Sequence, residues 1–124
     1  MSALAHATPD PNLVLTKAAL RAAESLGLSN ADLAATIGVS EPTVSRMKAH
    51  GRTILPNSKE GELALLLIRL FRSLEPLIGG DSQARKLWMS SHNQALLGVP
   101  QELIRRADGL VRTVAYLDGM RAAS

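Results

Sequence analysis

A short run of hydroxyl and cationic side chains is the part of this sequence best suited to contact a ligand. Between residues 40 and 52 it supplies Ser40, Thr43, Ser45, Arg46, Lys48 and Arg52. Arginine can donate two hydrogen bonds to the O6/N7 edge of guanine in the major groove, a contact worth roughly 1–3 kcal/mol of discrimination. Hydroxyls and ammonium groups more often bind phosphates, which position a protein without reading sequence. The run therefore predicts contact with double-stranded DNA, with Arg46 reading bases and the other five making phosphate or flanking contacts.

Two short helices joined by a tight turn would present these side chains. Ser29 can cap the first helix, with Asp32 three residues later completing a capping box, and Gly38 ends that helix. Ser40 can cap the second helix, where Pro42 is tolerated because N–H groups in a first turn have no intrahelical partner. We therefore expect a helix-turn-helix between residues 28 and 50.

The apolar positions of this segment fit two helices packed across a turn. They are Leu33, Ala34, Ile37, Val39, Val44 and Met47. Helical spacing puts Val44 and Met47 on the inner face of the second helix, whereas its outer face carries Pro42, Ser45, Arg46 and Ala49. The alternative is an ordinary helical hairpin with a solvated arginine, but the spacing of Ala34, Gly38 and Val44 is typical of helix-turn-helix DNA readers.

Composition sets limits on the fold and its partners. With 124 residues the chain can form one ordinary core, or two small helical units sharing an interface, which we prefer. No strand pattern is evident, so the predicted fold class is all-α. The net charge is +3, with six Lys/Arg against four Asp/Glu up to Lys59 and eight against seven beyond it. Neither half is strongly basic, so we expect a dimer that reads two half-sites.

Several classes of protein are disfavoured. Cysteine is absent, which excludes disulfides and fits a reducing cytoplasm. The most apolar run, residues 63–68, is far shorter than the roughly 20 residues of a membrane span. The three aromatic residues, Phe71, Trp88 and Tyr116, lie outside the DNA-reading segment, which disfavours base stacking on single strands.

The chain divides into three predicted parts. Residues 1–11 are read as a flexible arm. Residues 12–57 form the helix-turn-helix domain, which opens with a helix over residues 12–26 that has Leu13, Leu20 and Leu26 on its apolar side. Residues 58–124 form a small helical domain. Its first helix starts near Asn57 and Glu60, which have capping-box spacing, and runs to about residue 74, before Pro76 and a Gly-Gly pair.

This long helix is apolar around almost its whole circumference. Such a helix must be covered on several sides, either centrally within its domain or at a subunit interface. We take the second possibility as the basis for a dimerisation surface formed by Leu63, Leu66, Leu67, Leu70 and Phe71.

The rest of the chain predicts three shorter elements. Asp81 can cap a helix to about residue 90, and a loop follows over residues 92–99. Pro100 opens a helix over residues 101–107, and Asp108-Gly109 interrupts before a last helix. That helix carries Leu110, Val114, Leu117 and Met120 near one face.

The stretch from residue 84 to 109 resembles the toxin-binding domain of the MbcA/ParS/Xre family of antitoxins. The matching residues are Trp88, Asn93, Ala95, Leu96, Gly98, Pro100, Leu103 and Gly109, followed by a helix with Val114, Leu117 and Asp118. The sequence departs from the family at His92, where Pro is frequent, and at Leu97, where Gly is frequent. With an Xre-type helix-turn-helix in front, the order of parts is similar to that of Xre antitoxins paired with RES-domain toxins.

The resemblance implies that the protein inhibits a toxin by covering its active site. RES toxins are similar to ADP-ribosyl-transferring folds and deplete NAD, and related antitoxins cover the toxin's active-site entrance with their C-terminal region. The DNA-reading half would then bind the operator of the toxin–antitoxin operon and repress it. The candidate toxin-binding residues are Trp88, Asn93, Leu96, Gly98, Pro100, Tyr116, Leu117, Asp118 and Arg121. A purely structural role, with Trp88 filling the core beneath a connecting loop, stays open.

Two other functions fit the sequence less well. For an enzyme, His6, His50 and His92 lie in separate segments, no metal-ligand spacing is present and no glycine-rich phosphate loop follows a strand. We therefore expect no enzymatic activity, metal or cofactor. A dimeric helix-turn-helix repressor whose C-terminal domain only dimerises or senses a ligand is the alternative, but it would not need the pattern from Trp88 to Gly109.

Overall fold

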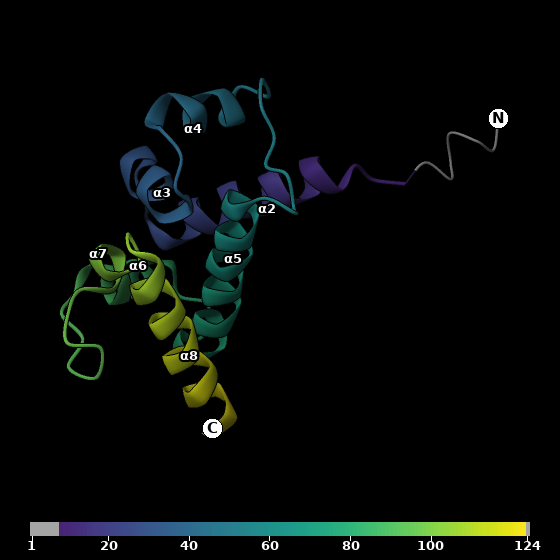
Figure 1. The fold of residues 1–124 in the computed structure, drawn as a ribbon. Coiled ribbons are helices and arrows are strands. Elements are labelled where there is room, and N and C mark those ends of the chain that lie inside the picture. Colours follow the sequence, from purple (N-terminus) through teal and green to yellow (C-terminus); the bar gives the residue numbers. More distant parts are fainter. Residues whose placement is uncertain (1–7, 124) are drawn as a thin grey trace.

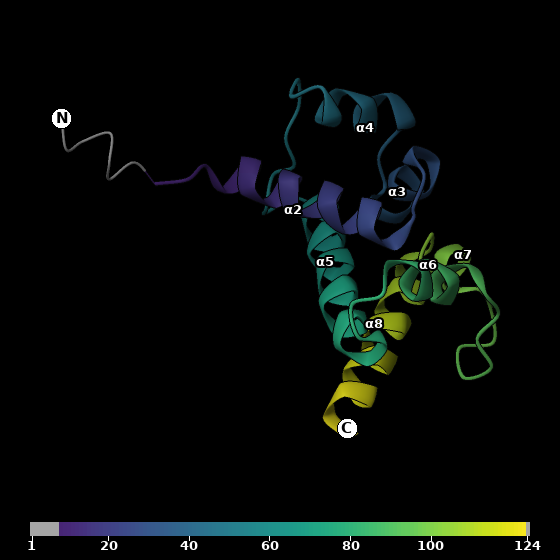
Figure 2. The same cartoon turned by 180° about the vertical axis from the view of Figure 1, so that it is seen from behind.

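The computed structural model describes residues 8–123, which form seven α-helices with the longest, α5, at the centre (Figures 1 and 2). The expected fold class, all-α with a helix-turn-helix domain followed by a helical domain, is confirmed. The helices are α2 (Pro11–Leu26), α3 (Asn30–Ile37), α4 (Glu41–Lys48), α5 (Lys59–Ile78), α6 (Ser82–Ser90), α7 (Pro100–Leu103) and α8 (Ala107–Ala123). Most of the arm predicted over residues 1–11 lies outside the described residues, and Pro11 already belongs to α2, capped by Asp10.

Helix α5 begins and ends differently from the prediction. Its cap is Ser58, whose Oγ accepts a hydrogen bond from the Gly61 N–H, and not Asn57. Pro76 was expected to break the helix, but it lies inside it, and α5 continues to Gly79 in the left-handed conformation. A proline in a helix interior removes a hydrogen bond. Burial of Leu74 together with the partly buried Leu77 and Ile78 that follow offsets that loss.

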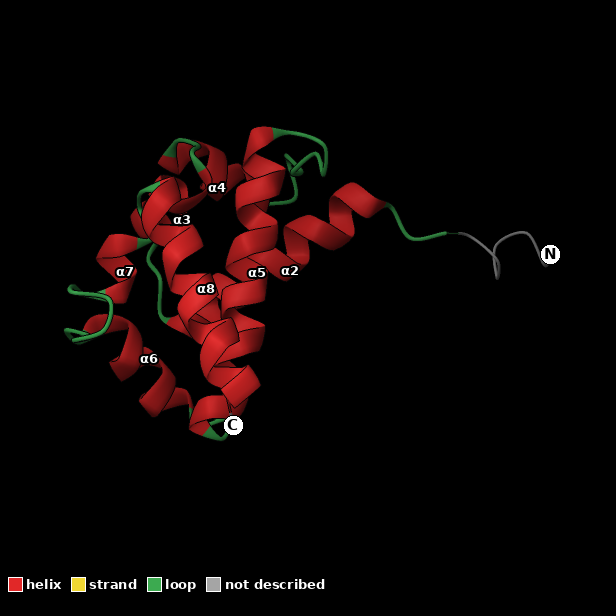
Figure 3. Ribbon diagram, turned by 60° about the horizontal axis from the view of Figure 1, so that its bottom comes forward, coloured by secondary structure: helices red, strands yellow, loops and turns green. Residues whose placement is uncertain are grey.

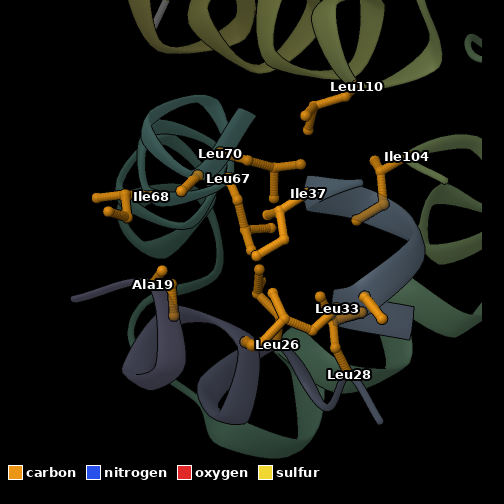
Figure 4. Close-up of a cluster of buried hydrophobic side chains, with 14 of the residues drawn as sticks. Ala19, Leu26, Leu28, Leu33, Ile37, Leu67, Ile68, Leu70, Ile104 and Leu110 are labelled. Carbon is orange, nitrogen blue, oxygen red and sulfur yellow. The ribbon is translucent and has the colours of Figure 1, made fainter. Parts of the chain in front are cut away.

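The core of the molecule surrounds α5. Helices α2 and α3 pack on it from the N-terminal half, while α8 and α6 pack on it from the C-terminal half (Figure 3). Figure 4 shows its Leu67 and Leu70 within one apolar cluster that draws on both halves. The N-terminal half contributes Leu26, Leu33 and Ile37, and the C-terminal half contributes Ile104 and Leu110. The two halves therefore share a single continuous core.

This packing corrects the proposed dimerisation surface. Leu67 and Leu70 are completely buried within one chain, so their assignment to a subunit interface is wrong. Leu63, Leu66 and Phe71 are partly buried against the same core. The apolar circumference of α5 is explained by a central position, because neighbouring helices of its own chain cover several of its sides. In the middle turns of α5, Leu65 is about half exposed.

The helix-turn-helix forms as the capping residues predict. The Ser29 side chain accepts a hydrogen bond from the Asp32 N–H, and Asp32 returns one by accepting from the Ser29 N–H, both at 3.0 Å. Gly38 ends α3 with a φ of 76°, and Ser40 caps α4. In α2, Leu26 is buried and Leu20 is partly buried as predicted, but Leu13 is exposed, so its predicted place on the apolar side is wrong. The buried face runs instead through Leu15, Thr16, Ala19, Ala22, Ala23 and Leu26.

The start of the last helix also differs from the prediction. Asp108 and Gly109 do not separate two helices, because both lie in the first turn of α8. Helix α7 ends at Leu103, four residues before the predicted end at residue 107. The chain needs glycine here because of a close approach. A Cβ on Gly109 would lie 2.0 Å from the carbonyl oxygen of Leu103. Gly109 thus allows α8 to start directly against the end of α7.

Two arginines of the C-terminal half tie it to the N-terminal half. Arg85 is buried, and its Nε donates to the carbonyl oxygen of Ser25 at the end of α2 at 2.7 Å. Its Nη1 pairs with Glu75 at 2.7 Å, and its guanidinium lies 5.5 Å from the centre of the Phe71 ring. A buried cation with this many partners avoids the free-energy penalty of an unpaired charge.

The second arginine is Arg105, which forms an ion pair with Asp32, the acidic member of the α3 capping box. Burial raises the pKa of Asp32, but hydrogen bonds from the Ser29 backbone, from Arg105 and from the Ser29 side chain, together with the Arg105 charge, outweigh it. The pKa is therefore lower than its usual value of 3.8. The N-terminus of α3 is thus held by a residue from the turn before α8.

This pairing predicts a pH-dependent stability. Asp32→Asn keeps an oxygen that can accept from the Ser29 N–H but removes the charge that faces Arg105. A carboxyl whose pKa is lowered by folding stabilises the folded state above its unfolded pKa, and this contribution is lost as the pH falls through the lowered value. We expect urea denaturation at pH 7 to show a loss of about 0.5–1 kcal/mol for the variant.

The difference between the two proteins should shrink as the pH falls below 3.8. Arg105→Gln is the matched control, because it removes the other partner and should be non-additive with Asp32→Asn in a double-mutant cycle. A difference that stays constant with pH would contradict the ion pair as its cause.

Candidate nucleic-acid and protein interfaces

The outer face of α4 presents the side chains that the sequence predicts for DNA reading. Pro42, Ser45, Arg46 and Ala49 are exposed, whereas Val44 and Met47 are buried, so the predicted orientation of the helix is confirmed. Arg46 lies on the exposed surface, where its Nη2 donates to Thr43 Oγ1 at 3.0 Å. This contact leaves further guanidinium donors for a nucleic acid, since arginine carries five N–H groups.

Thr43 supports Arg46 and does not lie on the surface. Its side chain is buried, and its hydroxyl also lies 2.8 Å from Ser40 Oγ, the cap of the helix. Because this hydroxyl is engaged on both sides, Thr43 positions the arginine, and its predicted phosphate contact is wrong for this structure. Ser40 itself accepts from the Thr43 N–H at 3.2 Å. Ser40, Thr43 and Arg46 therefore form one small hydrogen-bonded group at the start of α4.

Of the remaining predicted DNA contacts, Ser45 and Lys48 are exposed and Arg52 is engaged within the chain. Arg52 Nη2 forms an ion pair with Glu60 at 3.0 Å, and its Nη1 is buried. This pair holds part of the Arg52 guanidinium within the chain. Lys48 donates to Asn30 Oδ1 across the two helices of the motif.

Lys17 and Arg21 are cations that the sequence analysis did not single out. Both are exposed on α2 and line a surface hollow of about 670 Å³ together with Asn30 and Lys48. Their spacing of four residues places them on one face of α2, but only the folded chain shows that this face adjoins the end of α4. They extend the basic surface of the motif beyond the reading helix.

The loop between α6 and α7 forms a second candidate surface. Asn93 organises it, as predicted for this residue type: its backbone N–H and carbonyl bond to Gly98 at 2.8 and 3.3 Å, and its Oδ1 accepts from the Leu96 N–H at 3.0 Å. Gly98 is required by packing, because a Cβ there would lie 2.9 Å from the Leu103 side chain. Leu97 takes a φ of 58°.

Several residues that were predicted to contact a toxin lie beneath this surface and support it. Leu96, Pro100 and Leu117 are buried, so their assignment as direct contacts is wrong for the structure as it stands. Trp88 and Tyr116 are partly buried against the core. Trp88 keeps an exposed part that lines a hollow with Asn93.

The polar residues of α8 are bound into the fold as well. Asp118 accepts a hydrogen bond from Ser73 Oγ at 2.7 Å and pairs with Arg69 at 2.6 Å, while Arg121 donates to Ser73 at 3.3 Å. The hydrogen bond from Ser73, helped by the arginines, lowers the pKa of Asp118 below its usual value although burial acts in the opposite direction. Asp118 and Arg121 therefore join α8 to α5.

Residues 8–123 contain no group of three or more His, Cys, Asp or Glu side chains placed to hold a metal ion. Over the same residues, no helix combines the length and apolar character needed to cross a membrane.

Two family models match the chain in succession. The model of the antitoxin Xre-like helix-turn-helix domain matches residues 5–69, which contain α2, α3, α4 and the first half of α5. The model of the antitoxin Xre/MbcA/ParS C-terminal toxin-binding domain matches residues 73–122. A comparison with curated proteins found no significant match. The two family matches meet inside α5, the helix on which both halves pack.

The geometry of α4 generates a test of DNA reading. Arg46→Ala removes the outward guanidinium and leaves the buried Val44 and Met47 of α4 unchanged. We expect about tenfold or greater loss of affinity for operator DNA, since a bidentate base contact is worth roughly 1–3 kcal/mol. Fluorescence anisotropy with the promoter fragment upstream of the gene measures this. Arg106→Ala is the control, because Arg106 is an equally exposed cation in the other half. Equal losses in both variants would show a charge effect only.

Proposed function

Because the chain belongs to the Xre-type antitoxins, with an Xre-like helix-turn-helix domain followed by an Xre/MbcA/ParS toxin-binding domain, we propose that it neutralises a RES-type, NAD-depleting toxin. In this role the C-terminal half covers the active site of the toxin. The observation that carries the proposal is the succession of the two antitoxin domains over nearly the whole chain.

The C-terminal half is suited to inhibit a toxin by covering its active site. It carries the exposed apolar residues Leu87, Leu97 and Val111. The loop between α6 and α7 projects from the helices (Figure 1). A protein that blocks another protein's active site needs a fixed surface of this kind and no catalytic groups of its own.

The N-terminal half is suited to operator binding and repression of its own operon. Arg46, Ser45 and Lys48 are exposed on one helix, and Lys17 and Arg21 adjoin it. These residues provide few positive charges, so a single subunit binds DNA weakly and two linked subunits bind far better. We place this system in the cytoplasm, where operator DNA is found.

We propose that a homodimer forms through the apolar surface that the fold leaves exposed on α2 and α5. Val14 and Leu65 are each about half exposed and line a groove of about 310 Å³ with Pro11 and Pro56. Contiguous exposed apolar groups of this kind favour self-association. This groove replaces the buried Leu67 and Leu70 as the self-association surface.

The alternative, a repressor whose C-terminal domain only dimerises or senses a ligand, accounts for the helix-turn-helix. It leaves the match to a toxin-binding domain over residues 73–122 without a role. We therefore favour the antitoxin.

Co-expression with the adjacent open reading frame tests the proposed function. If that frame encodes the toxin, the wild-type chain should restore growth and co-purify with it. Arg46→Ala should do the same, because it changes the other surface of the molecule. If the adjacent frame encodes a toxin that the chain neither neutralises nor binds, the proposed function is wrong. If the chain restores growth but cells that express the toxin alone do not lose cellular NAD, the RES assignment is wrong.

Sedimentation tests the dimer. Val14→Asp should shift the wild-type dimer toward monomer, because it places a charge in the apolar groove. Leu87→Asp introduces the same charge at an exposed leucine of the other half and should leave the dimer intact. A monomeric wild-type chain, or equal dissociation by both variants, would contradict this interface.

A further inference from the structure

Leu97 combines two unfavourable features at one position. Its φ of 58° lies in the left-handed region, which costs a non-glycine residue roughly 1–2 kcal/mol. Its side chain is 79% exposed, the largest exposure among the large apolar residues that the structure describes. Neither feature stabilises the fold. Strain of this kind persists where the surrounding structure imposes it, often at sites that bind a partner.

The surrounding structure holds the loop firmly. Asn93 and Gly98 close it through paired backbone hydrogen bonds, and Asn93 Oδ1 accepts from the Leu96 N–H. The Leu96 side chain is buried, and Arg112 from α8 donates to the Leu96 carbonyl. Both neighbours of Leu97 are fixed in this way, and the loop that contains it projects from the helices (Figures 1 and 2). Preorganisation reduces the entropy lost on binding.

Further apolar side chains flank the loop. Asn93 lines a hollow with Leu87 and Trp88, and Arg112 lines a second hollow with Val111. Leu87 and Val111 are both more than half exposed. Because Asn93 belongs to the loop and Arg112 donates to its Leu96 carbonyl, both apolar areas adjoin the loop that carries Leu97. Apolar groups surround a central anchor in the same way at many protein–protein interfaces.

We propose that Leu97 is the anchor that inserts into an apolar pocket of the toxin, with Leu87 and Val111 packing around that pocket's rim. This inference rests on the proposed function, and the occupant is the toxin because the toxin-binding domain match over residues 73–122 includes the whole loop. Leu97 is not among the toxin-binding residues predicted from the sequence.

Leu97→Asn tests the anchor without harming the fold. Asparagine tolerates the left-handed conformation better than leucine, so the melting temperature should stay equal or rise. The affinity for the purified product of the adjacent open reading frame, measured by biolayer interferometry, should fall about tenfold or more, and growth rescue should weaken. Leu97→Met, which keeps a long apolar side chain, should retain most of the affinity.

Leu55→Asn is the control, because Leu55 is another leucine that is more than half exposed and lies in the segment between α4 and α5. If the wild-type chain binds and Leu97→Asn binds equally well, the anchor is wrong and the proposed function stands. A wild-type chain that does not bind would overturn the proposed function and this inference with it. Loss of self-association with unchanged toxin affinity would assign Leu97 to a second copy of the chain and overturn the inference.

Discussion

The burial of α5 is the constraint on which the rest of the structure depends. A helix with apolar residues on most sides is stable in water only when several neighbours cover it. Here the cover comes from α2 and α3 on one side and from α6 and α8 on the other. Truncating a fully buried leucine such as Leu67 or Leu70 typically costs 2–5 kcal/mol, a large part of the stability of a small domain. Each half of the chain therefore depends on the other half for its core.

The sequence was most informative where local chemistry decides structure. Capping by Ser29, Ser40 and Asp81 depends on residues within one turn, and the confirmed faces of α4 follow from helical spacing alone. Longer-range features could not be read in this way. From the sequence Gly109 resembles a helix breaker, but in the fold it allows close contact with the carbonyl of Leu103. Pro76 lies within α5, where Leu74 is buried and the following Leu77 is partly buried.

The same distinction applies to the candidate site. Residue type and family resemblance located the loop after α6, but they could not separate the residues that shape it from those that face outward. Leu96 is buried, whereas the adjacent Leu97 is exposed to solvent, although the two residues are of the same type. The polar residues of α8 show a similar ambiguity, since Asp118 and Arg121 bond to partners on α5 that lie far away in sequence.

The ion pair between Arg85 and Glu75, together with the bond from Arg85 to the end of α2, has a consequence for the lifetime of the protein. Since one core and one buried cation serve both halves, the chain is expected to open as a single cooperative unit. A protease that captures the opened chain would remove DNA contact and toxin contact in the same event. In the antitoxin proposed here, release of the toxin and release of the operator would be timed by one unfolding equilibrium.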